Sequence, residues 1–304
     1  MVAQRDAHQL YPFAGHWFEL DGLRMHYLDE GPSSGPPLVL CHGNPTWSFY
    51  YRTLIPELSR RYRVIVPDHI GCGRSDKPQA YPYRLAQHIE NLEALLAHLD
   101  LEAITLVMHD WGGGIGMGYA TRHPEQVARF VVFNTAAFYL PAVPWILRLA
   151  RTRTLGALLI RGFNAFAGLA VWLAVADRRR MTKPVRRGYL APYDSWRHRI
   201  AVHRFVQDIP TTPDHPTRAT INGIDAHLSI FRDHPMLIIW GAQDWIFTVK
   251  DFLAGWQTRF PDAEVHVLGD AGHYVVEDAH ERILPLMRDF LARTGTQQET
   301  TNTG

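Results

Sequence analysis

Residues 107–114 read VMHDWGGG, so one carboxylate, Asp110, stands between an apolar run and a glycine cluster. This order is typical of a nucleophile elbow, a sharp strand-to-helix turn that exposes a nucleophilic side chain. Serine is the usual residue there, whereas an aspartate is already ionised near neutral pH and needs no base before it attacks. Acylation of a carboxylate makes a reactive anhydride, but displacement at a saturated carbon leaves a stable alkyl ester. The sequence therefore predicts that Asp110 attacks activated carbon: a carbon–halogen bond, an epoxide or a strained lactone.

Two further polar residues follow later apolar runs. Asp244 comes after MLIIWG (236–241) and His273 comes after EVHVLG (264–269), so the chain order is nucleophile, acid, histidine. This is the order of a catalytic triad built on an elbow. In a hydrolytic cycle His273, oriented by Asp244, would activate water against the ester. Asp270 and Asp278 flank the histidine and are alternative acids.

The loop after PLVLC (37–41) contains Asn44, and Trp111 directly follows the nucleophile. Their backbone N–H groups are expected to form an oxyanion hole, while the amide and indole N–H groups lie near the departing group. Such donors suit a leaving halide or a leaving carboxylate oxygen. The competing interpretations are that Asp110 only caps a helix and that His273 is one of 17 histidines with a structural role.

The elements that must position these residues alternate along the chain. An alternating run at 24–29 indicates an early antiparallel strand, and 85–101 has a helical pattern. Short β-branched runs indicate further strands. These runs are 37–42, 63–68, 104–109, 129–134, 236–241 and 264–269. Strands and helices in alternation predict an α/β fold with a mostly parallel sheet and helices on both faces. The segment 135–229 shows no clear strand and is interpreted as an inserted helical cap over the carboxyl ends of the strands. The predicted division is therefore a core in two parts, 1–134 and 230–304, around the cap, with a polar tail at 294–304 expected to fray.

Composition indicates which partners and which cellular compartment to expect. The formal net charge of +1 over 304 residues gives no global reason to expect nucleic acid. Two cysteines, Cys41 and Cys72, and no secretory pattern at the start favour a reduced cytoplasmic compartment. The apolar stretch 165–176 is too short to span a bilayer, so the protein is expected not to be an integral membrane protein. The stretch is interpreted as a buried helix, with an interfacial helix as the alternative. The arginine-rich segment 177–187 is interpreted as a solvated face of the cap, with a docking surface for a partner or anionic lipid as the alternative.

Several motifs together carry a resemblance to a known family. They are HGNPTWSFYYR (42–52), PDHIGCGRSDKP (67–78), HDWGGGIGM (109–117), GAQD (241–244) and AGHYVVED (271–278). They resemble the haloalkane dehalogenase superfamily of α/β-hydrolases over nearly the whole chain. The resemblance implies an α/β-hydrolase fold in which Asp110, Asp244 and His273 form the triad, and Asn44 with Trp111 forms the halide-binding pair.

Two departures from the wider superfamily bear on the function. One dehalogenase branch carries Glu where this chain has Asn134, which is consistent with Asp244 as the acid. Epoxide hydrolases usually lack the tryptophan after the nucleophile and use paired cap tyrosines; Tyr139, Tyr189 and Tyr193 keep that activity as a lesser alternative.

The cap segments 151–170 and 191–210 most resemble the β-lactone decarboxylases of bacterial long-chain olefin biosynthesis. That resemblance implies a carbon–carbon lyase that converts a cis-3-alkyl-4-alkyl-oxetan-2-one to a cis-alkene and carbon dioxide without a metal or organic cofactor. It also implies a small hydrophobic substrate and, as a pathway neighbour that could dock, a β-lactone synthetase. A haloalkane dehalogenase working through an alkyl-Asp ester is the main alternative, and a catalytically silent receptor on the same fold is another.

Overall fold

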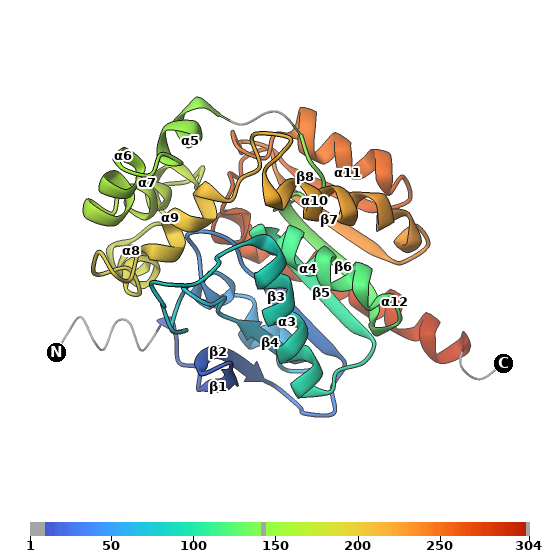
Figure 1. The fold of residues 1–304 in the computed structure, drawn as a ribbon. Helices are drawn as coiled ribbons and strands as arrows, with labels where there is room; N and C mark the ends of the chain where they lie inside the picture. Colours follow the sequence, from blue (N-terminus) through green and yellow to red (C-terminus); the bar gives the residue numbers. More distant parts are fainter. Residues whose placement is uncertain (1–9, 141–143, 302–304) are drawn as a thin grey trace.

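The eight strands of the protein form one sheet in the order β1-β2-β4-β3-β5-β6-β7-β8 (Figure 1). The computed structural model describes residues 10–140 and 144–301. The strands are β1 (Gly15–Leu20), β2 (Leu23–Glu30), β3 (Pro37–Cys41), β4 (Arg63–Pro67), β5 (Ile104–Asp110), β6 (Val127–Thr135), β7 (Met236–Gly241) and β8 (Glu264–Leu268). From β4 to β8 every pairing is parallel, whereas β1 and β2 form an antiparallel hairpin whose second strand pairs with β4.

All seven strands expected from the sequence are present, and the mostly parallel α/β architecture is confirmed. Strand β1 was not predicted. Its residues are largely exposed because it forms the sheet edge, so it carries no buried apolar run. The hairpin turns through Asp21 and Gly22, both at positive φ, which is the geometry that an Asp-Gly turn between antiparallel strands requires.

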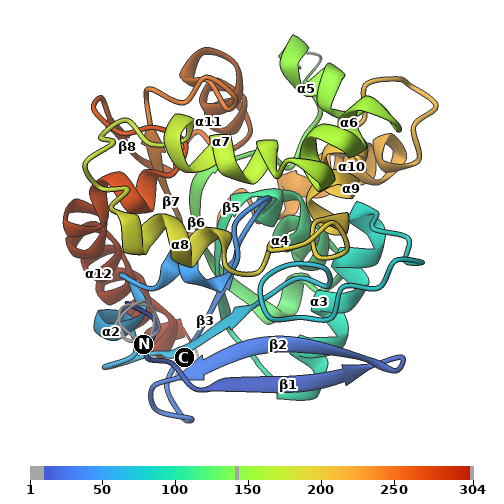
Figure 2. The ribbon, with the colours of Figure 1, turned by 90° about the vertical axis from the view of Figure 1, so that its left-hand side faces the viewer.

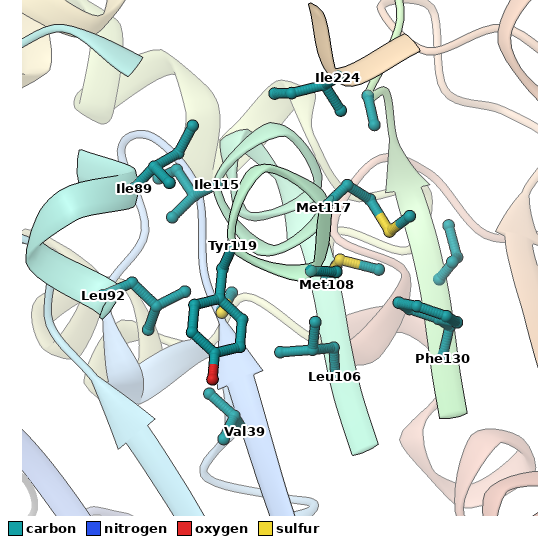
Figure 3. Close-up of a cluster of buried hydrophobic side chains, with 14 of the residues drawn as sticks. Val39, Ile89, Leu92, Leu106, Met108, Ile115, Met117, Tyr119, Phe130 and Ile224 are labelled. Carbon is teal, nitrogen blue, oxygen red and sulfur yellow. The ribbon is translucent and has the colours of Figure 1, made fainter. Parts of the chain in front are cut away.

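Alternate residues of the parallel strands pack into two separate cores. On one face the side chains of Val39, Leu106 and Phe130 contact α3 (Leu85–Leu99) and α4 (Trp111–Arg122), as Figure 3 shows. On the other face Leu38 and Val107 contact α2 (Ile55–Leu58) and α12 (Val275–Thr301). Because both faces are covered, the strands are apolar without alternation, as their sequences indicated.

The described part of the segment between β6 and β7, which lacks residues 141–143, contains helices and connecting loops but no strand. They are α5 (Trp145–Ala150), α6 (Leu155–Ala157), η3 (Leu158–Gly162), α7 (Ala165–Leu173), α8 (Lys183–Leu190), α9 (Ile200–Gln207), α10 (Pro216–His227) and η4 (Leu228–Phe231). Both ribbon views show α5, α6 and α7 on the side of the molecule away from the β1–β2 hairpin (Figures 1 and 2). Helix α10 instead packs against α3 and α4. The boundaries at 134/135 and 229/230 remain predictions.

Two expectations about helices were wrong. The stretch 165–176 is not a buried helix: α7 ends at Leu173, and Leu169, Trp172 and Leu173 are each more than 40% exposed. The polar tail is helical as far as Thr301, because α12 continues beyond the core, and residues 302–304 lie outside the described residues. Across the described chain no one helix combines the length and apolarity that crossing a membrane takes; only the pair Leu155–Gly162 and Ala165–Leu173, bent by 68° between its halves, passes that test together.

A buried ion pair joins three separate parts of the chain. Two guanidinium nitrogens of Arg52, in the loop after η1 (Ser48–Tyr51), each donate to a carboxylate oxygen of Glu277 at 2.8 Å. The hydroxyl of Tyr189, on α8, donates to the same carboxylate at 2.8 Å. Both charged side chains are only about 5% exposed. The pair therefore ties α12 and α8 to the loop that follows β3.

Replacing Glu277 with Gln is expected to lower the free energy of unfolding by about 3–5 kcal/mol, because it leaves the Arg52 charge buried without a counter-ion. The matched control is Glu281→Gln, which removes the partner of Arg180 in a pair that is 36% and 52% exposed. That change should cost about 0–1 kcal/mol. Urea denaturation of both variants measures the difference, and equal losses would contradict the assignment.

Candidate active site

The side chain of Asp110 is presented by a strained turn between β5 and α4. Its backbone has φ 52° and ψ −124°, and its side chain makes no capping hydrogen bond to α4, so the interpretation of Asp110 as a helix cap is wrong. Two glycines permit the close approach of the neighbouring backbone. A Cβ on Gly43 would lie 2.0 Å from Asp110 Oδ1, and a Cβ on Gly112 would lie 2.1 Å from the Cys41 carbonyl oxygen. The sharp turn therefore depends on glycine on both sides of the carboxylate.

The two carboxylate oxygens of Asp110 have different surroundings. Oδ1 accepts a hydrogen bond from the backbone N–H of Asn44 at 2.6 Å, and the backbone N–H of Trp111 also donates to the carboxylate. Oδ2 faces Nε2 of His273 at 3.7 Å. The two N–H groups that were expected to form an oxyanion hole thus bind the Asp110 carboxylate, and Oδ2 is the oxygen that faces the imidazole.

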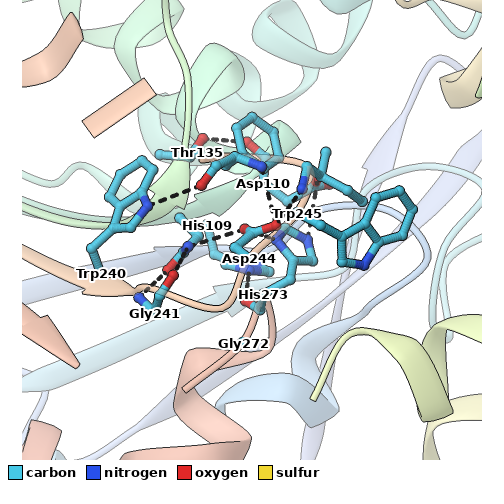
Figure 4. A network of polar contacts seen from close by, with 12 residues as sticks. His109, Asp110, Thr135, Trp240, Gly241, Asp244, Trp245, Gly272 and His273 are labelled. Atoms are coloured by element: carbon cyan, nitrogen blue, oxygen red, sulfur yellow. Dashed lines mark hydrogen bonds and ion pairs between the residues drawn. The ribbon is translucent and has the colours of Figure 1, made fainter. Parts of the chain in front are cut away.

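His273 is oriented by Asp244. Its Nδ1 lies 2.8 Å from Asp244 Oδ2, so Nδ1 carries the donated proton and Nε2 points towards Asp110. The other oxygen, Oδ1, accepts from the backbone N–H groups of Ile246 at 2.7 Å and Phe247 at 3.0 Å. Figure 4 shows the three predicted triad residues meeting above the sheet.

Asn134 supports the acid. Its amide nitrogen donates to Asp244 Oδ2 at 3.0 Å and to the Gly241 carbonyl at 3.0 Å, and its amide oxygen accepts from the Gly241 N–H at 2.8 Å. Sequence reasoning noted Asn134 only as a strand-end residue where an acid could stand. Its position at the end of β6, beside β7, was the feature that could have indicated a contact with Asp244.

The alternative acids are engaged elsewhere. Asp278 accepts from the backbone N–H groups of Ala176, Asp177 and Gly272 at 2.8–3.1 Å, and so joins the cap to the loop that carries the histidine. Asp270 forms an exposed ion pair with Arg282. Neither contacts His273.

His109 was also missed by the sequence analysis. Its Nε2 lies 2.8 Å from the carbonyl oxygen of His273, and its ring packs between those of Tyr50 and His273 at centroid distances of 4.4 and 4.6 Å. On the other side the ring of Phe247 stacks on His273 at 5.5 Å. The imidazole is therefore held by ring packing as well as by hydrogen bonds.

A cavity of about 420 Å³ opens above Asp110, and Asn44, Trp111 and His273 also line it. The Asn44 amide donates to the Val202 carbonyl of α9 at 3.2 Å, which connects the loop to the cap. Among the described residues none accepts from the Trp111 indole N–H, which leaves it available to a bound group. The remaining walls are mostly apolar, as at Leu85, Phe138, Ile160, Leu169, Val206, Ile221 and Phe252.

The cap tyrosines do not form a pair over the nucleophile. Tyr189 donates to Glu277, and Tyr193 donates to the Thr46 carbonyl at 3.3 Å; neither lines the cavity. Of the three cap tyrosines named from the sequence, Tyr139 alone lines it. The feature that kept epoxide hydrolysis as an alternative is therefore missing among the described residues.

The site shifts the pKa values of two of its members. Burial raises the pKa of Asp110 above the ordinary 3.8, although His273 and the N–H groups of Asn44 and Trp111 oppose the shift. Burial disfavours the charged form of His273, but the charge and hydrogen bond of Asp244 and the charge of Asp110 outweigh it, so the pKa of His273 is raised. Over the described ranges, no three His, Cys, Asp or Glu side chains are grouped so that they could hold a metal ion.

Residues 36–279 match the family described as alpha/beta hydrolase fold. The chain belongs to this family. It is 47% identical over 293 residues, 94% of this chain and 91% of the relative, to a cis-3-alkyl-4-alkyloxetan-2-one decarboxylase of Shewanella oneidensis. A haloalkane dehalogenase of Mycobacterium marinum is 36% identical over 88% of this chain and 91% of that relative.

Among solved structures, a haloalkane dehalogenase loop variant of Bradyrhizobium elkanii superimposes with a TM-score of 0.85 at 24% identity, covering 95% of this chain and 99% of that one. The predicted fold and superfamily are confirmed.

If Asp110 is the nucleophile, as its position in the elbow predicts, only its ionised form can attack, so the rate of displacement is expected to fall as the pH drops through its raised pKa. A ¹³C NMR titration of carboxyl-labelled protein, with Asp110→Asn to identify the signal, should show a midpoint above 3.8. Exposed Asp270, whose pKa is lowered by Arg282, serves as the internal comparison. A midpoint for Asp110 at or below that of Asp270 would show that burial does not control the nucleophile.

Proposed function

We propose that this protein is a β-lactone decarboxylase that converts cis-3-alkyl-4-alkyl-oxetan-2-ones to cis-alkenes and carbon dioxide, with Asp110 as the nucleophile. The observation that carries the proposal is the 47% identity, over 94% of the chain, to a protein named for this activity. The site supports it, because the Asp110 carboxylate, whose Oδ2 faces His273, lines a mostly apolar cavity. Such a cavity suits two alkyl chains and a small polar ring.

In the first step Oδ2 of Asp110 attacks C4, the ring carbon that bears oxygen. The C4–O bond breaks with inversion, its electron pair stays on the departing oxygen, and the substrate becomes an alkyl ester of Asp110 with a free carboxylate on C3. Ring strain favours this opening, and the indole N–H of Trp111 and the amide of Asn44 are placed to bind the carboxylate that forms.

In the second step the C3–carboxylate bond breaks and its electron pair forms the C3–C4 double bond. The bond from C4 to Asp110 breaks at the same time and returns its pair to the enzyme carboxylate. Inversion has placed the Asp110 oxygen opposite the carboxylate, so anti elimination keeps the two alkyl groups cis. No water or proton is consumed.

His273 then has a role other than that of a base. Its Nε2 lies 3.7 Å from Oδ2 of Asp110, so it is placed to stabilise the charge that returns to this carboxylate. The charge of Asp110 is in turn one of the causes that raise the pKa of His273. A haloalkane dehalogenase would need neutral His273 for the second half of its cycle.

Dehalogenation is the second candidate, because the Trp111 indole N–H and the Asn44 amide also suit a halide, and a relative at 36% identity carries that name. Docking of a β-lactone synthetase on 177–187 and a cytoplasmic location stay predictions. Two of the arginines in that stretch, Arg179 and Arg180, pair with Asp177 and Glu281.

Purified protein incubated with a long-chain cis-β-lactone is expected to release cis-alkene and carbon dioxide over many turnovers. Asp110→Asn should lower the rate by at least about 10⁴-fold, since it removes the nucleophile. Alkene is measured by gas chromatography, with 1,2-dibromoethane tested in parallel. Fast bromide release beside untouched lactone would assign the protein to the dehalogenases, and no turnover of either would favour a silent receptor.

A lactone labelled with ¹⁸O in the ring distinguishes attack at C4 from attack at the carbonyl. Attack at C4 keeps the ring oxygen on the carboxylate, so the label is expected in carbon dioxide. Carbonyl attack, which makes an anhydride, leaves the ring oxygen on C4, from where it must depart into water. Mass spectrometry of the headspace, sampled before carbon dioxide exchanges oxygen with water, reports the route; label found only in water would rule out attack at C4.

A further inference from the structure

We propose that the outer face of the cap docks on an anionic lipid surface and that the active-site cavity opens into that surface. The face is defined here as the apolar cap face. Its members are the half-exposed large hydrophobic residues of α5 to α7: Ile146, Leu149, Leu155, Leu158, Phe163, Leu169, Trp172 and Leu173.

The concentration of apolar side chains on this face is unusual for a surface in water. Eight of the thirteen exposed large hydrophobic residues in the described chain lie between Ile146 and Leu173. Phe163 is 73% exposed and Leu158 is 50% exposed. Exposed apolar residues scattered singly need no explanation, but a gathered set marks an interaction surface. The 68° bend between Leu155–Gly162 and Ala165–Leu173 favours a segment that lies in an interface over one that crosses it.

The apolar cap face is continuous with the cavity. Ile146, Leu149, Leu169 and Leu173 line the cavity and are also 39–49% exposed to solvent. Trp245, from the loop after β7, lines it too and is 43% exposed. These residues therefore form the rim through which the cavity communicates with the surface. A molecule that leaves a lipid layer through this rim meets apolar side chains all the way to Asp110.

The charge of the cap indicates which surface would fit. Residues 144–190 contain ten Arg and Lys but one acid, Asp177, whereas the whole chain has a net charge of only +1. No described residue forms an ion pair with Arg148, Arg153, Arg178, Lys183 or Arg187. The guanidinium of Arg186 lies 4.2 Å from the ring of the half-exposed Trp172. A cation and an indole ring are therefore in contact at the edge of the apolar cap face. Apolar residues with cations around them suit an anionic headgroup layer.

The same charge disfavours a second copy of this chain as the occupant. Two copies meeting by this face would bring two strongly basic segments together, and like charges across an interface oppose association. The benefit to catalysis rests on the proposed function, because a lactone with two long alkyl chains partitions into lipid. The docking itself does not depend on which substrate the site takes.

Co-sedimentation of the full chain with vesicles tests the inference without any turnover. The protein is expected to bind vesicles that contain phosphatidylglycerol more tightly than vesicles of phosphatidylcholine alone, and less tightly as salt is raised. The double change Leu158→Ser and Phe163→Ser should weaken binding roughly 10- to 100-fold, because each residue loses the transfer of its side chain into the interface. Neither residue lines the cavity.

The matched control is Ile230→Ser with Val267→Ser, which removes two side chains that are 46% and 49% exposed outside the cap. Its vesicle binding should equal that of the unchanged protein. Equal losses in both double variants, or no binding to anionic vesicles, would overturn the proposal. Sedimentation velocity tests for a dimer. If the unchanged protein is a dimer and only the Leu158→Ser/Phe163→Ser variant is a monomer, the face binds a second copy instead.

Turnover separates this inference from the proposed function. Both double variants should turn over a short-chain, water-soluble substrate at the unchanged rate, which also shows that they fold. If the protein binds vesicles but does not convert the lactone, the docking stands and the proposed reaction fails. If it converts the lactone but does not bind vesicles, the proposed reaction stands and the docking fails.

Discussion

The site depends on one asymmetry: the backbone N–H groups of Asn44 and Trp111 bind the Asp110 carboxylate, the first of them at Oδ1, whereas Oδ2 faces the imidazole of His273. Buried carboxylates are costly unless hydrogen bonds compensate for lost water. Here the compensation comes from main-chain atoms of two loops at the carboxyl ends of β3 and β5. Because the sheet fixes those loops, it also fixes the direction in which Oδ2 points, towards His273. Glycine at 43 and 112 is the steric condition for bringing the loops that close.

Support for the histidine extends across neighbouring strands in the same way. Asp244 after β7 holds Nδ1 of His273, Asn134 at the end of β6 holds Asp244, and His109 near the end of β5 contacts the His273 carbonyl. The first two contacts cross between adjacent strands of the sheet, whereas the third reaches from β5 to the loop after β8. The parallel order of these strands therefore places at one edge groups that lie more than a hundred residues apart in the chain.

The cap has two apolar sides with different consequences. Its inner side lines the cavity above Asp110, where burial raises the pKa of that carboxyl and strengthens the electrostatic interactions around it. Its outer side leaves Leu158, Phe163 and Trp172 in contact with solvent. A helix that is apolar all round is normally buried. The exposure of these apolar side chains is explained if the outer side of the cap faces lipid.

Local sequence determined much of this protein. The apolar runs specified the strands because a strand covered on both faces needs no polar side, and the order Asp110, Asp244, His273 at strand ends indicated the triad. The tertiary structure alone decided which Asp110 oxygen faces the histidine, which of three acids contacts the histidine, and that Asn134 and His109 support them. It also decided that α7 is half-exposed, since an apolar pattern does not say whether another element covers it. Periodicity reports how a segment folds, but contacts between segments distant in the chain depend on sheet order and packing, which no local pattern contains.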